Sequence, residues 1–104
     1  MPRYGEDARG AVLSSTRQEA KEPPLYKVML HNDDYTTMDF VVHVLITVFR
    51  KSIDDAVRIM LAVHHEGIGV AGVYPAEIAE TKIIAVHQLA REESFPLKCT
   101  MEPE

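Results

Sequence analysis

The fold is decided by residues 25–39, which read LYKVMLHNDDYTTMD. Tyr26, Val28 and Leu30 fall on one face of an extended segment, which predicts a β-strand over 25–30. The next segment, 31–35, is rich in Asn and Asp, which favour turns because their side chains bond nearby backbone amides. Residues 36–39 (Thr-Thr-Met-Asp) then match a capping box with an acid in place of the usual Glu, so a helix is predicted to begin here.

Beyond this stretch, local signals predict two successive helices. Apolar residues at helical spacing predict a helix from about 37 to 50. Ser52 begins a second capping signal, and Gly67 stands where the end of a helix favours positive φ. The buried face of the helix between them is predicted to consist of Ile53, Ala56, Val57, Met60, Leu61 and His64.

The last third of the chain predicts a strand, a helix and a strand. Residues 69–74 read as a strand weakened by two glycines, and Pro75 suits the first turn of a third helix. The buried stripe of that helix is predicted to be Ala79, Ile83, Val86 and Ala90. Residues 97–101 alternate as a final strand, and 102–104 are predicted to be a frayed end. The order β-α-α-β-α-β predicts an α+β fold, with three mostly antiparallel strands and three helices packed on one face.

The 104 residues divide into a tail and one domain. Residues 1–24 have few large apolar side chains, so a flexible N-terminal tail is predicted, followed by a core domain over 25–104. Basic and acidic residues balance in the tail, and the net charge of −5 therefore falls on the core.

Composition excludes several classes of function. A net charge of −5 argues against a broad contact with nucleic-acid phosphates. The longest apolar run is far short of the ~20 residues that cross a bilayer, so no membrane association is predicted. The single cysteine, Cys99, favours a reducing, cytoplasmic location. It has no activating neighbour in sequence, and the chain lacks a Gly-rich phosphate loop, so these residues give no support for nucleophilic catalysis or for a phosphate-bearing cofactor.

The densest polar cluster is Asn32-Asp33-Asp34-Tyr35-Thr36. One interpretation is a turn followed by a helix cap. The other is an acceptor-rich pocket for a cation such as an α-amino group, whose reference pKa of ~7.7–8.0 keeps it mostly charged at pH 7. Both interpretations use the same atoms, and the pattern alone leaves them open.

His64 is the second candidate. It is either a partly buried helix histidine or a neutral imidazole whose acceptor nitrogen binds a ligand N–H. Its neighbour His65 is a poor metal co-ligand, because adjacent helical side chains point about 100° apart. The nearby apolar side chains are core residues by their spacing, although methionine at a helix start also suits a pocket for large side chains.

Four segments resemble the ClpS adaptors of the ATP-dependent Clp protease: residues 26–41, 60–64, 76–82 and 96–100. They occur in the family's order, and the Asn-Asp-Asp-Tyr-Thr block with a distant Met-x-x-x-His is highly specific. The resemblance implies an adaptor that binds N-degrons, substrates whose first residue is Phe, Leu, Tyr or Trp. It also implies delivery to a ClpA- or ClpC-type unfoldase of the ClpP protease.

The resemblance also implies a role for individual residues. The groups that hydrogen-bond the substrate's α-amino group are matched by Asn32, Asp33 and His64. The side-chain pocket is matched by Thr36, Met38, Val41, Met60, Val63 and Leu97, with Asp34 at its border. Met38 matches a gatekeeper against β-branched Ile and Val. Contacts with the unfoldase's N-terminal domain are matched by Glu77 and Lys82.

Two positions depart from the family pattern. Thr37 replaces a common proline, which predicts a looser loop. Pro75 stands where many relatives have a capping Thr, which predicts a poorly capped third helix beside Glu77.

Two other functions stay open at this point. One is a ribosome-associated structural module, since the implied fold is shared with a ribosomal stalk domain. The other is a metal-dependent enzyme that uses Asp33, Asp34 and His64. The preferred prediction is a monomeric adaptor whose partners are N-degron substrates and the unfoldase.

Overall fold

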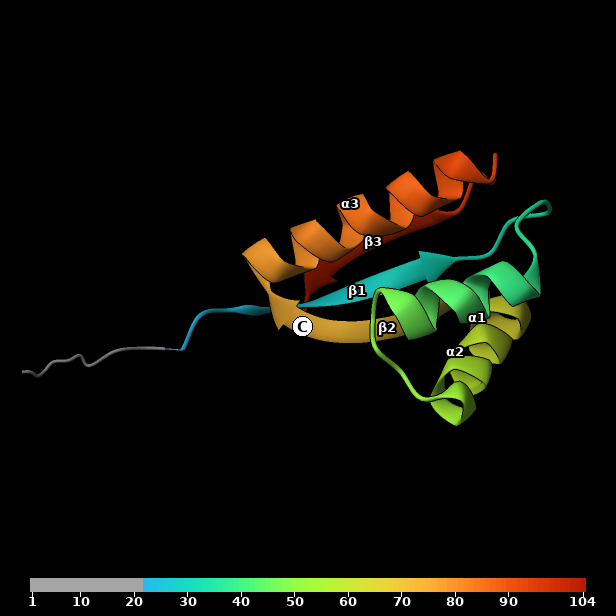
Figure 1. Ribbon diagram of the computed structural model, residues 1–104. Helices are drawn as coiled ribbons and strands as arrows, with labels where there is room; N and C mark the ends of the chain where they lie inside the picture. Colours follow the sequence, from blue (N-terminus) through green and yellow to red (C-terminus); the bar gives the residue numbers. More distant parts are fainter. Residues whose placement is uncertain (1–21) are drawn as a thin grey trace, which may run out of the picture.

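Residues 22–104 are described by a computed structural model with six elements of secondary structure (Figure 1). Their bounds are β1 Leu25–His31, α1 Met38–Thr47, α2 Ile53–Glu66, β2 Ile68–Pro75, α3 Ala76–Glu92 and β3 Lys98–Pro103. The predicted order β-α-α-β-α-β is confirmed. The predicted tail lies outside the described residues, apart from positions 22–24, which precede β1 without regular structure.

The three strands form one antiparallel sheet in the order β2-β1-β3. β1 is the central strand because it pairs with both β2 and β3, and its alternate residues Val28 and Leu30 are fully buried. The register with β2 shifts between Val28 and Met29, which marks a bulge. β1 therefore carries the chain through the middle of the domain and delivers the acidic turn at its end.

All three helices lie against one face of the sheet, as predicted (Figure 1). The core between the layers contains Val28 and Leu30 from β1 and the fully buried Val44 and Leu45 from α1. The buried positions of α3 are Ala79, Val86 and Ala90, in agreement with the predicted stripe. Ile83, the fourth predicted position, is partly buried against the same core.

The predicted buried face of α2 is wrong by part of a turn. The buried residues are Ala56, Ile59 and Val63, whereas Ile53, Val57 and Leu61 are exposed. The reason is a close approach of α2 to β2 at Gly69. A Cβ at Gly69 would lie 2.6 Å from Val63 Cγ2 and 3.1 Å from the Ile59 carbonyl oxygen. Because glycine has no side chain, the helix settles with Ile59 and Val63 facing the sheet.

The start of α1 also differs from the prediction in one respect. The N-cap is Thr37, whose hydroxyl accepts a hydrogen bond from the Phe40 N–H at 3.1 Å. Thr36 is the cap that the sequence pattern predicts, but its hydroxyl donates to Asp33 Oδ2 at 2.7 Å. The helix ends at Thr47, short of residue 50, and Arg50 adopts a left-handed conformation with φ of 58°.

The ends of α2, α3 and β3 can also be compared with the predictions from the sequence. Ser52 caps α2 through the Asp55 N–H, and Gly67 ends it with φ of 90°, as predicted. Pro75 is the N-cap of α3 without a side-chain hydrogen bond, so the weak capping predicted there is confirmed, although Pro75 lies just before the first turn. The predicted frayed end is wrong for Glu102 and Pro103, which pair with β1 as part of β3.

Candidate functional site

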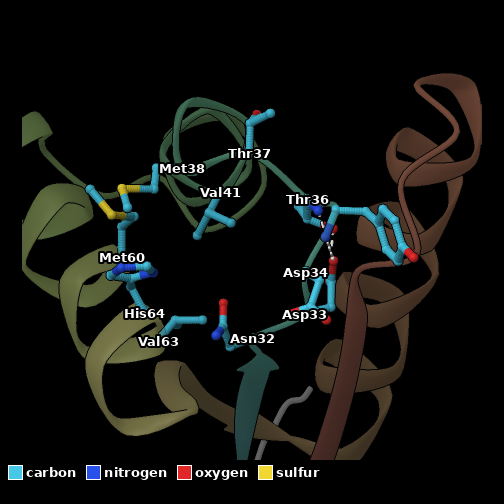
Figure 2. Close-up of a pocket in the computed structure, with 11 residues that line it drawn as sticks. Asn32, Asp33, Asp34, Thr36, Thr37, Met38, Val41, Met60, Val63 and His64 are labelled. Atoms are coloured by element: carbon cyan, nitrogen blue, oxygen red, sulfur yellow. Dashed lines mark hydrogen bonds between the residues drawn. The ribbon is translucent and has the colours of Figure 1, made fainter.

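The acidic turn after β1 is built around the carboxylate of Asp33 (Figure 2). Oδ1 accepts the backbone N–H groups of Tyr35 at 2.8 Å and Thr36 at 2.7 Å. Oδ2 accepts the Thr36 hydroxyl at 2.7 Å. These bonds fold the loop back on itself immediately before α1 begins, so the turn-and-cap interpretation of this cluster is part of its structure.

The same bonds perturb the acidity of Asp33. Partial burial raises the pKa of the carboxyl, but hydrogen bonds from the Thr36 N–H, the Thr36 hydroxyl and the Tyr35 N–H lower it more. The net result is that the pKa of Asp33 lies below its usual value of 3.8. Asp33 is therefore a carboxylate at neutral pH.

A second contact holds the turn beside α2. The Asn32 N–H donates to the carbonyl oxygen of Gly67, the residue that ends α2, at 2.9 Å. This bond fixes the loop next to the last turns of α2, which carry Met60, Val63 and His64. Residues about thirty positions apart in the sequence are thereby brought around one cavity.

The cavity has a volume of about 420 Å³ and is open to solvent. Its walls come from the turn after β1, the start of α1 and the end of α2. The lining residues are Asn32, Asp33, Asp34, Tyr35, Thr36, Thr37, Met38, Val41, Met60, Val63 and His64. Every residue that the sequence matched to the α-amino site lies here, and so does every pocket residue except Leu97.

The acidic turn and the methionines lie on opposite sides of the cavity, and His64 lies on the methionine side, beside Met60 (Figure 2). Asp33, Asp34 and Thr36 lie on one side, and Met38, Val41 and Met60 on the other. Val41 and Val63 are buried and form a firm wall, whereas Met38 is 43% exposed. This arrangement suits a ligand that carries a cation and a large apolar group a few ångströms apart.

Leu97 and His64, which the resemblance assigned to the binding site, differ from the other assigned residues in their burial. Leu97 is 4% exposed and packs in the core just before β3, so it does not line the cavity itself. His64 is exposed rather than partly buried, and its ring packs edge-on against His65 with centroids 5.2 Å apart.

Tyr35 and Thr37 line the cavity although the sequence did not single them out as binding residues. Tyr35 is 76% exposed, which is unusual for a large aromatic side chain. The sequence could have indicated them by their position, because all of residues 32–38 line the cavity. The pattern had identified Thr37 only as a departure from the family.

The metal alternative lacks a donor set. Within residues 22–104, no three His, Cys, Asp or Glu side chains come close enough together to hold a metal ion. Asp33, Asp34 and His64 share the cavity without forming such a group. Across the same residues, no helix has the length and apolar character needed to span a bilayer.

Glu77 and Lys82 lie on α3, away from this cavity. Glu77 is exposed in the first turn of the helix. Lys82 turns inward: its ammonium donates to the Val48 carbonyl oxygen at 2.8 Å and lies 5.6 Å from the centre of the Tyr74 ring. The structure therefore separates the two matched groups of residues into two regions.

A three-stranded sheet covered by three helices on one face, with an open pocket that is acidic on one side and apolar on the other, defines a small binding domain. Residues 21–100 match the family model of the ATP-dependent Clp protease adaptor protein ClpS. The chain belongs to this family and has its function as a Clp protease adaptor.

Similar proteins cover nearly the whole chain. The ClpS adapter of Desulfatibacillum aliphaticivorans is 61% identical over 95 residues, which are 91% of each protein. That of Myxococcus xanthus is 59% identical over 102 residues, 98% of this chain and 95% of the relative. The structure of Agrobacterium tumefaciens ClpS2 bound to L-phenylalaninamide superposes with a TM-score of 0.77 at 49% identity, covering 80% of this chain and 100% of that one.

Proposed function

We propose that this adaptor binds the first residue of substrate proteins when that residue is Phe, Leu, Tyr or Trp and its amine is free. It then delivers the substrate to a ClpA- or ClpC-type unfoldase of the ClpP protease. The observation that carries the proposal is the two-sided cavity, with acceptors facing an apolar wall. The cavity volume of about 420 Å³ exceeds that of a single large side chain, so a terminal residue and its amine both fit.

The polar side provides acceptors for an ammonium group. Among residues 22–104, the Thr36 hydroxyl is the one donor to Asp33 Oδ2, so this oxygen retains a lone pair for a second donor. The Asn32 side-chain oxygen and a ring nitrogen of His64, which lies across the cavity beside Met60, are the other acceptors in our assignment, and an ammonium has three N–H donors to match them. Burying this charge is costly unless it is fully paired, which is why the site needs several acceptors. An acetylated amine or an internal residue has at most one N–H, so it leaves these acceptors unpaired and is rejected.

The apolar side selects the side chain. Val41 and Val63 form the base, Met60 lines it, and Met38 closes the mouth and excludes β-branched Ile and Val. Thr36 and Asp34 border the opening, and Leu97 supports the base from the core. Burial of a Leu or Phe side chain contributes roughly 1.5–3 kcal/mol. The ligand of the Agrobacterium relative, L-phenylalaninamide, combines the same two features, an aromatic side chain and a free α-amine.

The other parts of the proposal concern what surrounds this binding step. No bond is made or broken by the adaptor, which acts as a cytoplasmic monomer without a cofactor. Glu77 and Lys82 face the unfoldase's N-terminal domain. The tail, residues 1–24, contacts the unfoldase during delivery.

Fluorescence anisotropy with short labelled peptides tests the cavity directly. The peptides differ only at the first residue, which is Leu, Phe, Ile or Ala, with N-acetyl-Leu as a control for the amine. Tight binding of the Leu and Phe peptides alone is the expected result. Equal binding of the acetylated peptide, or no binding of any peptide, would reject the cavity as a reader of N-termini.

A further inference from the structure

The methionines within residues 22–104 differ in how far solvent reaches their side chains. Met29 is 8% exposed in the sheet, and Met60 and Met101 are partly buried against the core. Met38 is 43% exposed, which makes it the most accessible of the four. Because oxidation of a side-chain sulfur depends on its exposure, Met38 is the first of these residues that a dissolved oxidant reaches.

Met38 belongs to the cavity and takes little part in holding the fold. It lies on the same side of the cavity as Met60, opposite the acidic turn (Figure 2). It is the first residue of α1, but the start of the helix is fixed by Thr37, whose hydroxyl accepts the Phe40 N–H. The buried residues of α1 are Phe40, Val41, Val44 and Leu45. A chemical change at Met38 therefore alters the cavity and leaves the core intact.

Oxidation of this thioether by hydrogen peroxide needs no other group of the protein. A lone pair of Met38 Sδ attacks one peroxide oxygen, the O–O bond breaks and an S–O bond forms. A proton moves to the departing oxygen, which leaves as water. The sulfur is oxidised by two electrons and the peroxide is reduced by two. The product, methionine sulfoxide, is polar where the thioether was apolar.

The sulfoxide places a hydrogen-bond acceptor on the apolar side of the cavity. The neighbouring wall consists of Val41 and Val63, whose side chains have no donor to offer it. An entering Leu or Phe side chain strips water from the sulfoxide oxygen and has no donor to replace that water. The acidic turn is unchanged by this reaction. Oxidation therefore removes recognition of the side chain while the acceptors for the amine remain.

We propose that Met38 is a modification site for hydrogen peroxide and other two-electron oxidants, and that its sulfoxide closes the cavity to N-degron substrates. The inference rests on the proposed function, since it requires that the cavity reads N-termini. Methionine sulfoxide reductases return the sulfoxide to the thioether, so the closure is reversible. A substrate side chain in the cavity covers the same sulfur, so substrate binding and oxidation oppose one another.

The full-length protein is treated with hydrogen peroxide and followed by two measurements, peptide mapping by mass spectrometry and anisotropy with a Leu-initiated peptide. Met38 is expected to become oxidised before Met29, Met60 and Met101. Peptide affinity is expected to fall about tenfold as Met38 is oxidised, at an unchanged thermal midpoint. Unchanged affinity of protein that is fully oxidised at Met38 would overturn the proposal. So would a loss of affinity that appears only with a lower thermal midpoint, because the damage would then lie in the core.

Met38→Leu separates this methionine from the others. Leucine keeps an apolar side chain of similar size and has no sulfur to oxidise. Each protein is judged by its affinity after peroxide relative to its own affinity before. This ratio is expected to stay near one for Met38→Leu and to fall as in wild type for the matched control Met101→Leu, which changes a residue of β3 outside the cavity. An equal fall in Met38→Leu and wild type would assign the effect to another residue.

Protection by a ligand tests the contact from the opposite direction. A saturating Leu-initiated peptide with a free amine is expected to slow the oxidation of Met38, whereas its N-acetylated form is expected to leave the rate unchanged. Equal rates with both peptides would show that a bound side chain does not cover Met38. Treatment of the oxidised protein with a methionine sulfoxide reductase is expected to restore affinity. Continued weak binding after Met38 is reduced would overturn the closure.

Failure of this inference can be distinguished from failure of the proposed function. If the untreated wild-type protein bound no N-degron peptide, the cavity would be rejected as a reader of N-termini, and the closure with it. If the untreated protein bound the peptide and the oxidised protein bound it equally well, the closure alone would be rejected. The order in which the methionines become oxidised is measured without any peptide and tests the modification site by itself.

Discussion

Asp33 combines two roles that a pair of substitutions separates. Its carboxylate folds the turn through three hydrogen bonds, and we propose that it also binds the substrate ammonium. Asp33→Ala removes both roles at once. Asp33→Asn keeps one oxygen in the place of Oδ1, which accepts the N–H groups of Tyr35 and Thr36. Its NH2 group takes the place of Oδ2, so the acceptor offered to the ammonium and the negative charge are both lost.

The size of each effect follows from these contacts. Loss of a capping-type side chain costs about 1–2 kcal/mol of folding free energy. That corresponds to a fall in thermal midpoint of roughly 4–16 °C for a domain of this size. A hydrogen bond to a charged group contributes about 1.5–3 kcal/mol, so its loss weakens peptide binding roughly 10- to 150-fold. Asp33→Ala is expected to show both losses, and Asp33→Asn chiefly the second.

The assay is anisotropy with a Leu-initiated peptide, alongside thermal unfolding of each variant. Asp34→Asn is the matched control, because it removes the same charge from the neighbouring exposed residue, for which no hydrogen bond within residues 22–104 is found. Because Asp34 only borders the opening of the cavity, its peptide affinity is expected to fall much less than that of Asp33→Asn, and its thermal midpoint to stay close to that of wild type. Equal weakening by Asp34→Asn and Asp33→Asn would refute a specific contact with Asp33 and indicate only a general attraction of the negative turn.

Three further predictions concern the same region. Folding lowers the pKa of Asp33, so its carboxylate contributes fully to stability at a pH well above 3.8 and loses this contribution as the pH falls through the pKa of the folded state. Asp33→Asn should therefore reduce the difference in thermal midpoint between pH 6 and pH 2. Met38→Ala should bind Ile- and Val-initiated peptides that wild type rejects, and continued rejection in the anisotropy assay would remove Met38 as the gate. Gly69→Ala should lower the free energy of unfolding measured in urea by about 1–3 kcal/mol, because the new Cβ would lie 2.6 Å from Val63 Cγ2. An unchanged free energy of unfolding would show that α2 can move away from β2 without cost.

The elements themselves could be predicted because their signals are local. Ser52 and Gly67 bound α2 through bonds and dihedral angles that involve only nearby residues. The alternation of Val28 and Leu30 predicted the central strand for the same reason. Each of these features is decided within a few residues, and a pattern in the sequence is enough to identify it.

The features that could not be predicted depend on another element. Periodicity placed Val57 and Leu61 on the buried face of α2, but the missing side chain of Gly69 in β2 decides which face approaches the sheet. The capping pattern pointed to Thr36, but Asp33 takes its hydroxyl and leaves the cap to Thr37. For α2 the deciding partner lies in another element, whereas for the cap it is Asp33, three residues before Thr36 in the same turn.

The candidate site likewise has a part that could be predicted from local sequence and a part that depends on a distant contact. Its turn was visible in the sequence as a block of Asn and Asp residues, whereas the pairing of that turn with Met60 and His64 came from a family resemblance. The structure provides a physical reason for the pairing: the Asn32 N–H donates to Gly67, the residue that ends α2. No pattern within one element predicts a bond between a loop and the end of a helix that follows it by about thirty residues.

That bond also bears on how the cavity discriminates between ligands. The turn is braced internally by Asp33 and tied to α2 through Asn32, and the apolar wall consists of the buried Val41 and Val63. A cavity held in this way needs little reordering when a ligand enters, so less of the binding energy is spent on ordering the site. Met38, 43% exposed at the mouth, is the adjustable part. In the proposed function, selectivity for the free amine therefore resides chiefly in the braced turn, and selectivity among side chains resides in Met38.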